Sequence, residues 1–161
     1  MTDLKPCRYA VSDLLPQEQP MLLLDAIVGW NDDCLVSEVN IRADSMFLAS
    51  DGMPPHIAIE WMAQTCGAMV GLQSLEQGEA VRIGFLLGTR DFVARVSRFA
   101  LGDKLTVTVR PVFSDGQMAV FDCQVKLASE VCATARLNLF QPESLEAMLN
   151  EQGLALRPEQ K

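Results

Sequence analysis

The sequence predicts an α+β fold in which one antiparallel β-sheet wraps around a single long helix. Three observations lead to this prediction. Residues 54–75 form one long stretch of helical composition whose one carboxylate is Glu60. Two segments of strand-like composition precede it and four follow it. A helix with so little charge must be covered on most sides, and a sheet curved around it provides that cover.

A hairpin is expected before the helix. Residues 21–30 and 34–42 are largely apolar runs separated by Asn31-Asp32-Asp33, a sequence typical of turns. They predict two paired strands. Ahead of them, VSDLL at residues 11–15 predicts a short helical turn, because Pro16 stops any longer helix.

The long helix is expected at residues 54–75, with its prolines where a first helical turn tolerates them. Ala63, Gly67 and Gly71 repeat every four residues within it. Glycine inside a helix costs about 0.5–1 kcal/mol relative to alanine. This smooth stripe would let another backbone segment approach the helix closely.

Strands are expected to fill most of the chain after the helix. Leu105, Val107 and Val109 alternate with polar residues, which is the pattern of a strand with one buried face. Turn sequences join the segments, so we expect an antiparallel meander. Pro142 then opens a short amphipathic tail helix at about residues 142–152. The four expected strand segments are residues 82–96, 103–113, 117–129 and 130–140.

The composition indicates one domain spanning residues 1–161, with a core at about 13–140. A chain of 161 residues that is 49% hydrophobic and 21% charged has too much apolar content to be disordered, and no linker divides it. Its net charge of -8 disfavours non-specific binding to nucleic acid or to an anionic membrane surface. No segment is apolar and long enough to predict a membrane span.

The five cysteines include no CxxC pair, and the sequence contains one histidine, His56. These counts argue against a disulfide framework and against a metal site. Cys66, on the long helix, is expected to be a buried, inert thiol. Because the amino-terminal residues lack the pattern of a signal peptide, we expect a cytoplasmic protein.

A curved sheet around one central helix is the hot-dog architecture, and the sequence resembles a family with this fold. LLPQEQPMLLLDAI (14–27) and PPHIAIEWMAQTCGA (54–68) are similar to segments of the β-hydroxyacyl-acyl-carrier-protein dehydratases. GTRDFVARVSRFALGDKLTVTV and SEVCATARLNLF resemble their downstream strands, so the similarity covers about residues 13–140. Within the family, the chain most resembles the dehydratase-like proteins of aryl polyene pigment clusters.

The resemblance implies removal of water from a 3-hydroxyacyl thioester in fatty acid or aryl polyene biosynthesis. It implies a substrate carried on the phosphopantetheine of an acyl carrier protein, and no metal or other cofactor. In the family, an acid on the helix works with a histidine from the preceding loop of the opposite subunit. That histidine is missing here, because Met46 stands fourteen residues before Glu60.

His56 and Glu60 are the candidate catalytic residues. Dehydration needs a base for the α-proton and an acid for the leaving hydroxyl. Imidazole titrates near neutral pH, and a carboxyl group on an apolar helix favours its protonated form. A spacing of four residues places the two Cβ atoms on one face, roughly 5–6 Å apart. Gln64 and Ile57 are the candidate substrate-binding residues, and free N–H groups of the first helical turn are candidate donors to the thioester carbonyl.

Arg90, Arg95 and Arg98 form the densest basic run of this acidic chain. They are the candidate docking patch for an acidic carrier protein, with ordinary solvated charges as the alternative. The sheet edges predict a dimer, which is either a homodimer or a heterodimer with a related dehydratase.

Three alternatives to a dehydratase active site stay open. His56 and Glu60 can form a simple helix-surface pair without catalytic function. In a hot-dog thioesterase, Glu60 would instead activate water against the thioester. The chain can also be a catalytically silent partner subunit of another dehydratase, an alternative that the missing loop histidine favours.

Overall fold

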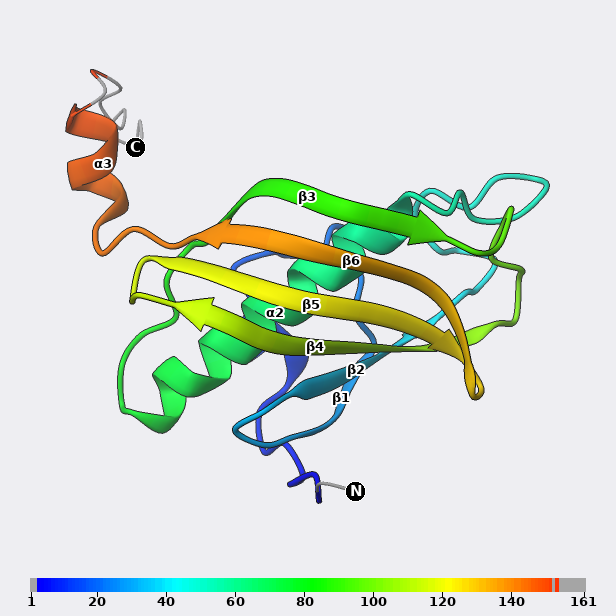
Figure 1. Ribbon diagram of the computed structural model, residues 1–161, viewed down its shortest axis with the longest axis horizontal. Coiled ribbons are helices and arrows are strands. Elements are labelled where there is room, and N and C mark those ends of the chain that lie inside the picture. The colour runs from blue at the N-terminus through cyan, green and yellow to red at the C-terminus, as the bar shows by residue number, and fades with distance from the viewer. Residues whose placement is uncertain (1–2, 152, 154–161) are drawn as a thin grey trace.

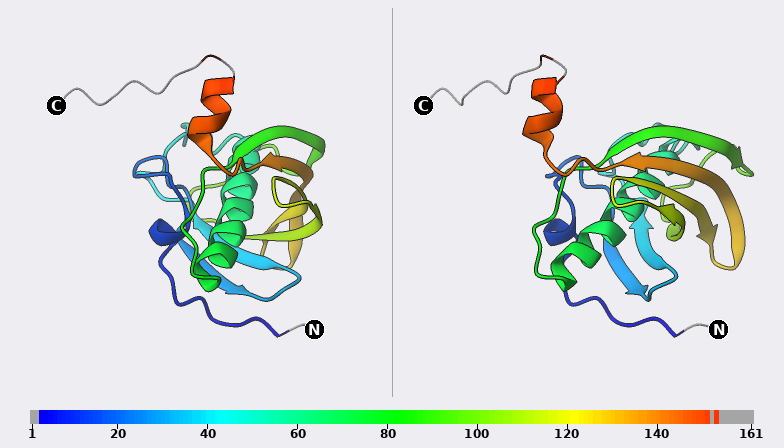
Figure 2. Two further views of the ribbon diagram at one scale, coloured as in Figure 1. Left: turned by 90° about the vertical axis from the view of Figure 1, so that its left-hand side faces the viewer. Right: turned by 60° about the vertical axis from the view of Figure 1, so that its left-hand side comes forward.

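A six-stranded antiparallel sheet curves around helix α2 (Ile57–Glu76) in the computed structural model, which describes residues 3–151 and 153 (Figures 1 and 2). The strand order is β1-β2-β4-β5-β6-β3. This arrangement confirms the α+β hot-dog fold expected from the sequence. The strands are β1 (Ala26–Trp30), β2 (Leu35–Asn40), β3 (Phe85–Ala94), β4 (Lys104–Ser114), β5 (Met118–Leu127) and β6 (Glu130–Phe140).

Strand β3 pairs with β6 and not with β4, its successor in the chain. The expected meander is therefore correct for β4, β5 and β6 and wrong for β3. The reason lies in the connection from β3 to β4. Phe99 exchanges two backbone hydrogen bonds with Met53 (2.7 and 3.0 Å), which brings this connection to the loop before α2. The chain thus crosses the end of the sheet and places β4 beside β2.

The segment before β1 is extended, but it does not belong to the sheet ladder. A strand was expected from residue 21, whereas β1 begins at Ala26. Residues 21–23 are held by the side chain of Gln64, which accepts a hydrogen bond from the N–H of Leu23 and donates one to the C=O of Met21. This segment therefore pairs with the helix instead of with a strand.

Helix α2 begins at Ile57, three residues later than expected. The N–H groups of Ile57, Ala58 and Ile59 donate to the carbonyls three residues earlier, at 3.1–3.2 Å. Pro54 and Pro55 have no N–H to donate, so the first turn forms on these shorter bonds. The N–H groups of Ile57 and Ala58, expected to be free for the substrate, are therefore already used within the turn.

Helix α2 is covered on most of its surface, as its lack of charge predicts. Gln73 and Glu76 are the helix residues classed as exposed. The short helix α1 (Val11–Leu14) packs against it where Gly71 has no side chain, and a Cβ there would meet the carbonyl oxygen of Leu14. The small-residue stripe therefore does admit another backbone segment.

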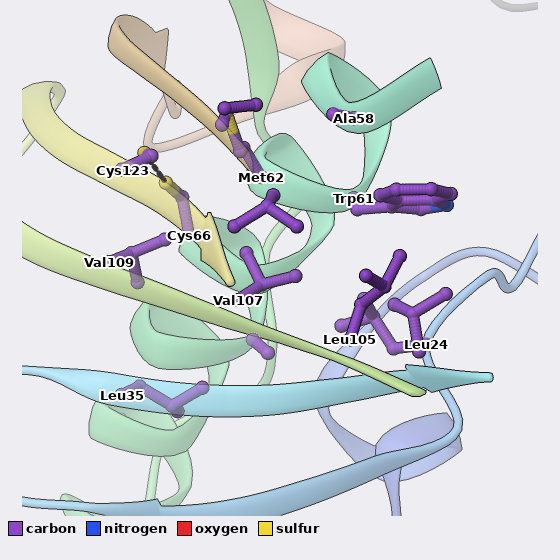
Figure 3. Packing of buried hydrophobic residues seen from close by; sticks show 14 of the residues in the cluster. Leu24, Leu35, Ala58, Trp61, Met62, Cys66, Leu105, Val107, Val109 and Cys123 are labelled. Carbon is purple, nitrogen blue, oxygen red and sulfur yellow. Dashed lines mark hydrogen bonds between the residues drawn. The ribbon is translucent and has the colours of Figure 1, made fainter. Parts of the chain in front are cut away.

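The core fills the space between α2 and the concave face of the sheet (Figure 3). Trp61 packs on Phe99 with ring centroids 5.0 Å apart and planes tilted by 59°. Leu105, Val107 and Val109 are fully buried, as their alternation predicts. This packing holds α2 in place and leaves one lateral face of the helix for the site described below.

Helix α3 (Leu145–Glu151) follows β6 and projects from the end of the sheet (Figures 1 and 2). It was expected at residues 142–152, and residue 152 lies outside the described residues. Among residues 3–151 and 153, no helix is both long enough and apolar enough to cross a membrane.

Candidate active site

A groove with a volume of about 320 Å³ runs along the half-covered face of α2. Glu60, Ala63, Gly67 and Val70 line it from the helix, at the three- and four-residue spacing of one helical face. Gln77 lines it at the helix end, so the groove follows α2 for 17 residues, or roughly 25 Å. The middle of this helical wall is small or apolar, and its two ends are polar.

The opposite wall of the groove comes from three segments that are distant in sequence. They are the approach to β3, the turn between β4 and β5, and the end of β6, and their lining residues include Arg82, Gly84, Leu86, Gln117 and Gln141. The pairing of β3 with β6 brings these segments together. No sequence motif marks them, so the sequence analysis missed this wall, and Arg82 with it.

Glu60 lies in the groove and is half-buried. Its carboxylate accepts a hydrogen bond from the amide nitrogen of Gln64 at 3.1 Å. Gln64 also lines the groove, where it was expected as a substrate-binding residue. Both of its amide protons and its carbonyl oxygen are engaged, with Glu60, Met21 and Leu23. In this structure Gln64 therefore orients the acid and leaves Glu60 as the more available polar group.

His56 is exposed and lies immediately before α2. It is not among the residues that line the groove, and no ion pair within the described residues joins its imidazole to Glu60. Ile57 is half-buried and also lies outside the groove lining. The structure thus brings Glu60 and Gln64 together, while the assignments of His56 and Ile57 stay predictions.

Met46 lines a different cavity, of about 260 Å³, together with Trp61 and Met53. This is the residue that stands where the resembled family has its loop histidine. Glu60 does not line that cavity. Within one chain, the position of the family histidine and the helix acid therefore open into separate spaces.

Of the candidate docking arginines, Arg90 lies in the middle of β3, and Arg95 and Arg98 follow the end of this strand. Arg90 and Arg95 are exposed, and no ion pair involves them in the part of the chain that the structure describes. Arg98 is paired with Asp51, with Nε and Oδ2 3.2 Å apart. Their role in carrier docking stays a prediction.

Residues 3–151 and 153 contain no group of three or more His, Cys, Asp or Glu side chains placed to hold a metal ion. Within the groove, Glu60 offers a carboxyl group in a partly enclosed channel that has both apolar and polar lining residues. Such a group can donate a proton to, or accept one from, a bound substrate.

Comparison with known proteins links this geometry to a family. Residues 9–150 match the family model described as ApeP-like, ApeP dehydratase. The 3-hydroxyacyl-[acyl-carrier-protein] dehydratase FabZ of Streptococcus equi subsp. zooepidemicus is 28% identical over 132 residues, covering 79% of this chain and 91% of that protein. FabZ of Streptococcus gordonii is 26% identical over 133 residues, which cover 80% of this chain and 92% of the relative.

Solved structures give the same result. The dehydratase heterocomplex ApeI:P from Xenorhabdus doucetiae contains a chain that is 31% identical, with a TM-score of 0.85, covering 90% of this chain and 99% of that one. The PaaI protein of Escherichia coli is 16% identical with a TM-score of 0.55, covering 71% of this chain and 80% of that one. At this low identity, the second similarity shows the shared fold alone.

Proposed function

Because the chain belongs to the ApeP-like dehydratase family, we propose that it is the acid-supplying subunit of a dehydratase acting on 3-hydroxyacyl thioesters. The observation that carries the proposal is the position of Glu60 in a groove long enough for an extended acyl thioester. The pathway we propose is fatty acid or aryl polyene biosynthesis, with the substrate delivered by an acyl carrier protein.

The reaction requires one proton to be removed and one to be added. A base takes the proton from C2, and its electron pair forms the C2–C3 double bond. The 3-hydroxyl group leaves with a proton from the Glu60 carboxyl group, as water. Gln64 fixes the orientation of that carboxyl group through its 3.1 Å hydrogen bond, so that the proton is presented to the groove.

Two sources of the base are compatible with the chain. His56 lies immediately before α2 and four residues ahead of Glu60, which supports an in-chain pair. Its position outside the groove lining supports the second source, a histidine from the partner subunit, as the resembled family arranges it. If neither source acts, this chain is a catalytically silent subunit.

The bare edge of β3 supports assembly with a second hot-dog subunit. The opposite edge of the sheet is covered at its end, where Lys5 exchanges two backbone hydrogen bonds with Trp30, the last residue of β1 (2.7 and 3.0 Å). Strand β3 ends the strand order and exposes 57% of Leu87 and 49% of Val93. Such an edge is a template for another strand. Leu86 of β3 also lines the groove, so a subunit on this edge would cover the site.

The partner we propose is a related dehydratase, in a heterodimer. Similarity to a chain of a dehydratase heterocomplex supports this choice. Met46 in place of the family histidine supports it as well, since two copies of this chain would lack that histidine altogether. A heterodimer restores it through the other subunit.

The function is tested with Glu60→Gln and His56→Ala, each assayed alone and with a co-encoded dehydratase, on a 3-hydroxyacyl thioester. Formation of the enoyl thioester is followed by ultraviolet absorbance, and release of free thiol reports hydrolysis. We expect Glu60→Gln to lower enoyl formation by about 10²–10⁴-fold without changing the melting temperature. Glutamine keeps a side-chain oxygen that can accept the hydrogen bond from Gln64. The variant should therefore fold like the wild type and differ from it in the loss of the acid.

The His56→Ala variant decides the source of the base. A loss as large as that of Glu60→Gln assigns the base to His56, and an unchanged rate assigns it to the partner. Full activity of Glu60→Gln in the complex would show that this chain does not supply the acid. Thiol release without enoyl product would identify a thioesterase instead.

A further inference from the structure

We propose that Arg82 binds the phosphate of the phosphopantetheine arm, at the end of the groove opposite Glu60. The identity of the arm rests on the proposed function. The position of the anion site rests on three features of the structure. They are the half-buried guanidinium group of Arg82, the length of the groove and the polarity of its walls.

Arg82 is a half-buried cation that has no partner within the described part of the chain. Its side chain lines the groove and makes no ion pair or hydrogen bond among the residues that the structure describes. Glu79 lines the same part of the groove and is not paired with it. The backbone is held in place, because the amide nitrogen of Gln141 donates to the carbonyl oxygen of Arg82 at 3.0 Å. A guanidinium group held there is a ready receptor for an oxyanion, since its planar fork matches phosphate.

The groove is long enough to hold the extended arm. Roughly 13 bonds separate the thioester sulfur from the phosphorus, and about 1.2 Å per bond in an extended chain gives about 16 Å. The reacting carbons add a few ångströms more. The groove follows α2 for roughly 25 Å from Glu60 to Gln77. A thioester placed at Glu60 therefore puts its phosphate in the half of the groove beyond Val70, within which a long arginine side chain such as that of Arg82 can reach it.

The polarity of the groove walls also favours an orientation of the arm with its phosphate at the Arg82 end. Next to Glu60 the helix presents Ala63 and Gly67, which leave room for a thin chain. Toward the far end the groove is lined by the carboxamides of Gln73, Gln77 and Gln117. The two amide groups of pantetheine can hydrogen-bond with carboxamides, whereas an alkyl chain cannot. The polar half of the substrate therefore suits the half of the groove that contains Arg82.

This placement brings the carrier protein to the turn between β4 and β5, since Gly116 and Gln117 of that turn line the groove near Arg82. The patch expected from the sequence, around Arg95, follows the other end of β3. Ten residues of strand separate the two ends by about 30 Å. Docking of the carrier protein near Arg82 and docking near Arg95 are therefore different arrangements, and an experiment can distinguish them.

The test measures binding of two ligands with the same saturated acyl chain, acyl-phosphopantetheine and acyl-pantetheine, by calorimetry on the full chain with its partner subunit. We expect the phosphorylated ligand to bind about tenfold or more tightly than the other. Arg82→Gln should abolish this preference and leave the affinity for acyl-pantetheine unchanged. Arg82→Lys should retain part of the preference, because an ammonium group still attracts phosphate.

The matched control is Arg110→Gln, which removes one positive charge from the outer face of the sheet. It should keep the full preference. The inference is overturned if the wild-type complex binds both ligands equally, if Arg82→Gln keeps the preference, or if Arg95→Gln abolishes it. If neither ligand binds the wild-type complex, the proposed function fails together with the inference.

Discussion

The carboxamide of Gln64 joins the acid Glu60 to the segment that precedes β1. Its nitrogen donates to Glu60 at 3.1 Å and to the carbonyl oxygen of Met21 at 2.8 Å, and its oxygen accepts from the N–H of Leu23 at 2.9 Å. Gln64 is 2% exposed, so these bonds form away from water. One buried side chain therefore orients the candidate acid and anchors the segment that leads into β1.

Gln64→Leu should destabilise the chain markedly. The substitution keeps the volume but removes the hydrogen-bond partner of the partly buried backbone groups of Met21 and Leu23, at a cost of up to about 1–3 kcal/mol for each group. We expect the free energy of unfolding in urea to fall by about 2–4 kcal/mol. Gln73→Leu, on an exposed position of the same helix, is the control and should change it by about 0.5 kcal/mol or less. Equal stabilities of the two variants would contradict the anchoring role.

Local patterns in the sequence predict much of the fold. Strand β6 was expected at residues 130–140 and has those bounds, because turn residues stand on one side and Pro142 follows. The long helix was recognised because Glu60 is its one carboxylate before Glu76. The neighbour of β3 was missed, since the choice between β4 and β6 depends on the Met53–Phe99 bridge, a contact between segments far apart in sequence.

The candidate site shows the same division between local and long-range information. Glu60 and Gln64 were found because a polar residue on an apolar helix is conspicuous by itself. The attachment of Gln64 to Met21 and Leu23 is long-range, so its positioning role could not be read from the spacing. Arg82 was missed for a related reason. It becomes part of the groove only when β3 pairs with β6.

Cys66 should make the stability of the chain sensitive to alkaline pH. Burial raises the pKa of the Cys66 thiol well above its ordinary value of about 9, and its contact with Cys123, with sulfurs 3.6 Å apart, raises it further (Figure 3). Above about pH 8.5 the unfolded chain loses a proton that the folded chain keeps. The stabilisation is therefore complete below that pH and is lost as the pH rises.

The measurement is urea unfolding of wild type and Cys66→Ala between pH 7 and 10. The free energy of unfolding should fall less steeply with rising pH in Cys66→Ala than in wild type, by up to about 1.4 kcal/mol per pH unit. Cys7→Ala, at a half-exposed thiol, is the control and should leave the slope as in wild type. Identical slopes in wild type and Cys66→Ala would rule out Cys66 as their source.

Gly71→Ala should destabilise the fold even though alanine favours helices. An added Cβ would meet the carbonyl oxygen of Leu14, a backbone atom that cannot move without displacing α1. We expect a net loss of about 1–3 kcal/mol in thermal or urea unfolding. Gly67→Ala is the control, because its nearest neighbour is the end of the Leu15 side chain at 3.1 Å, which can rotate away. A Gly71→Ala variant as stable as wild type would refute the close packing of α1.

Leu87→Lys should weaken assembly with the partner dehydratase while leaving the chain itself folded. Leu87 is 57% exposed on the bare β3 edge, and a lysine on an edge strand opposes the addition of another strand. We expect the dissociation constant of the complex, measured by sedimentation, to rise about tenfold or more. Val28→Lys is the matched control, since Val28 is 49% exposed but lies on β1, the edge strand at the opposite side of the sheet. Disruption by Val28→Lys with tolerance of Leu87→Lys would place the partner on β1, where it could not cover Glu60.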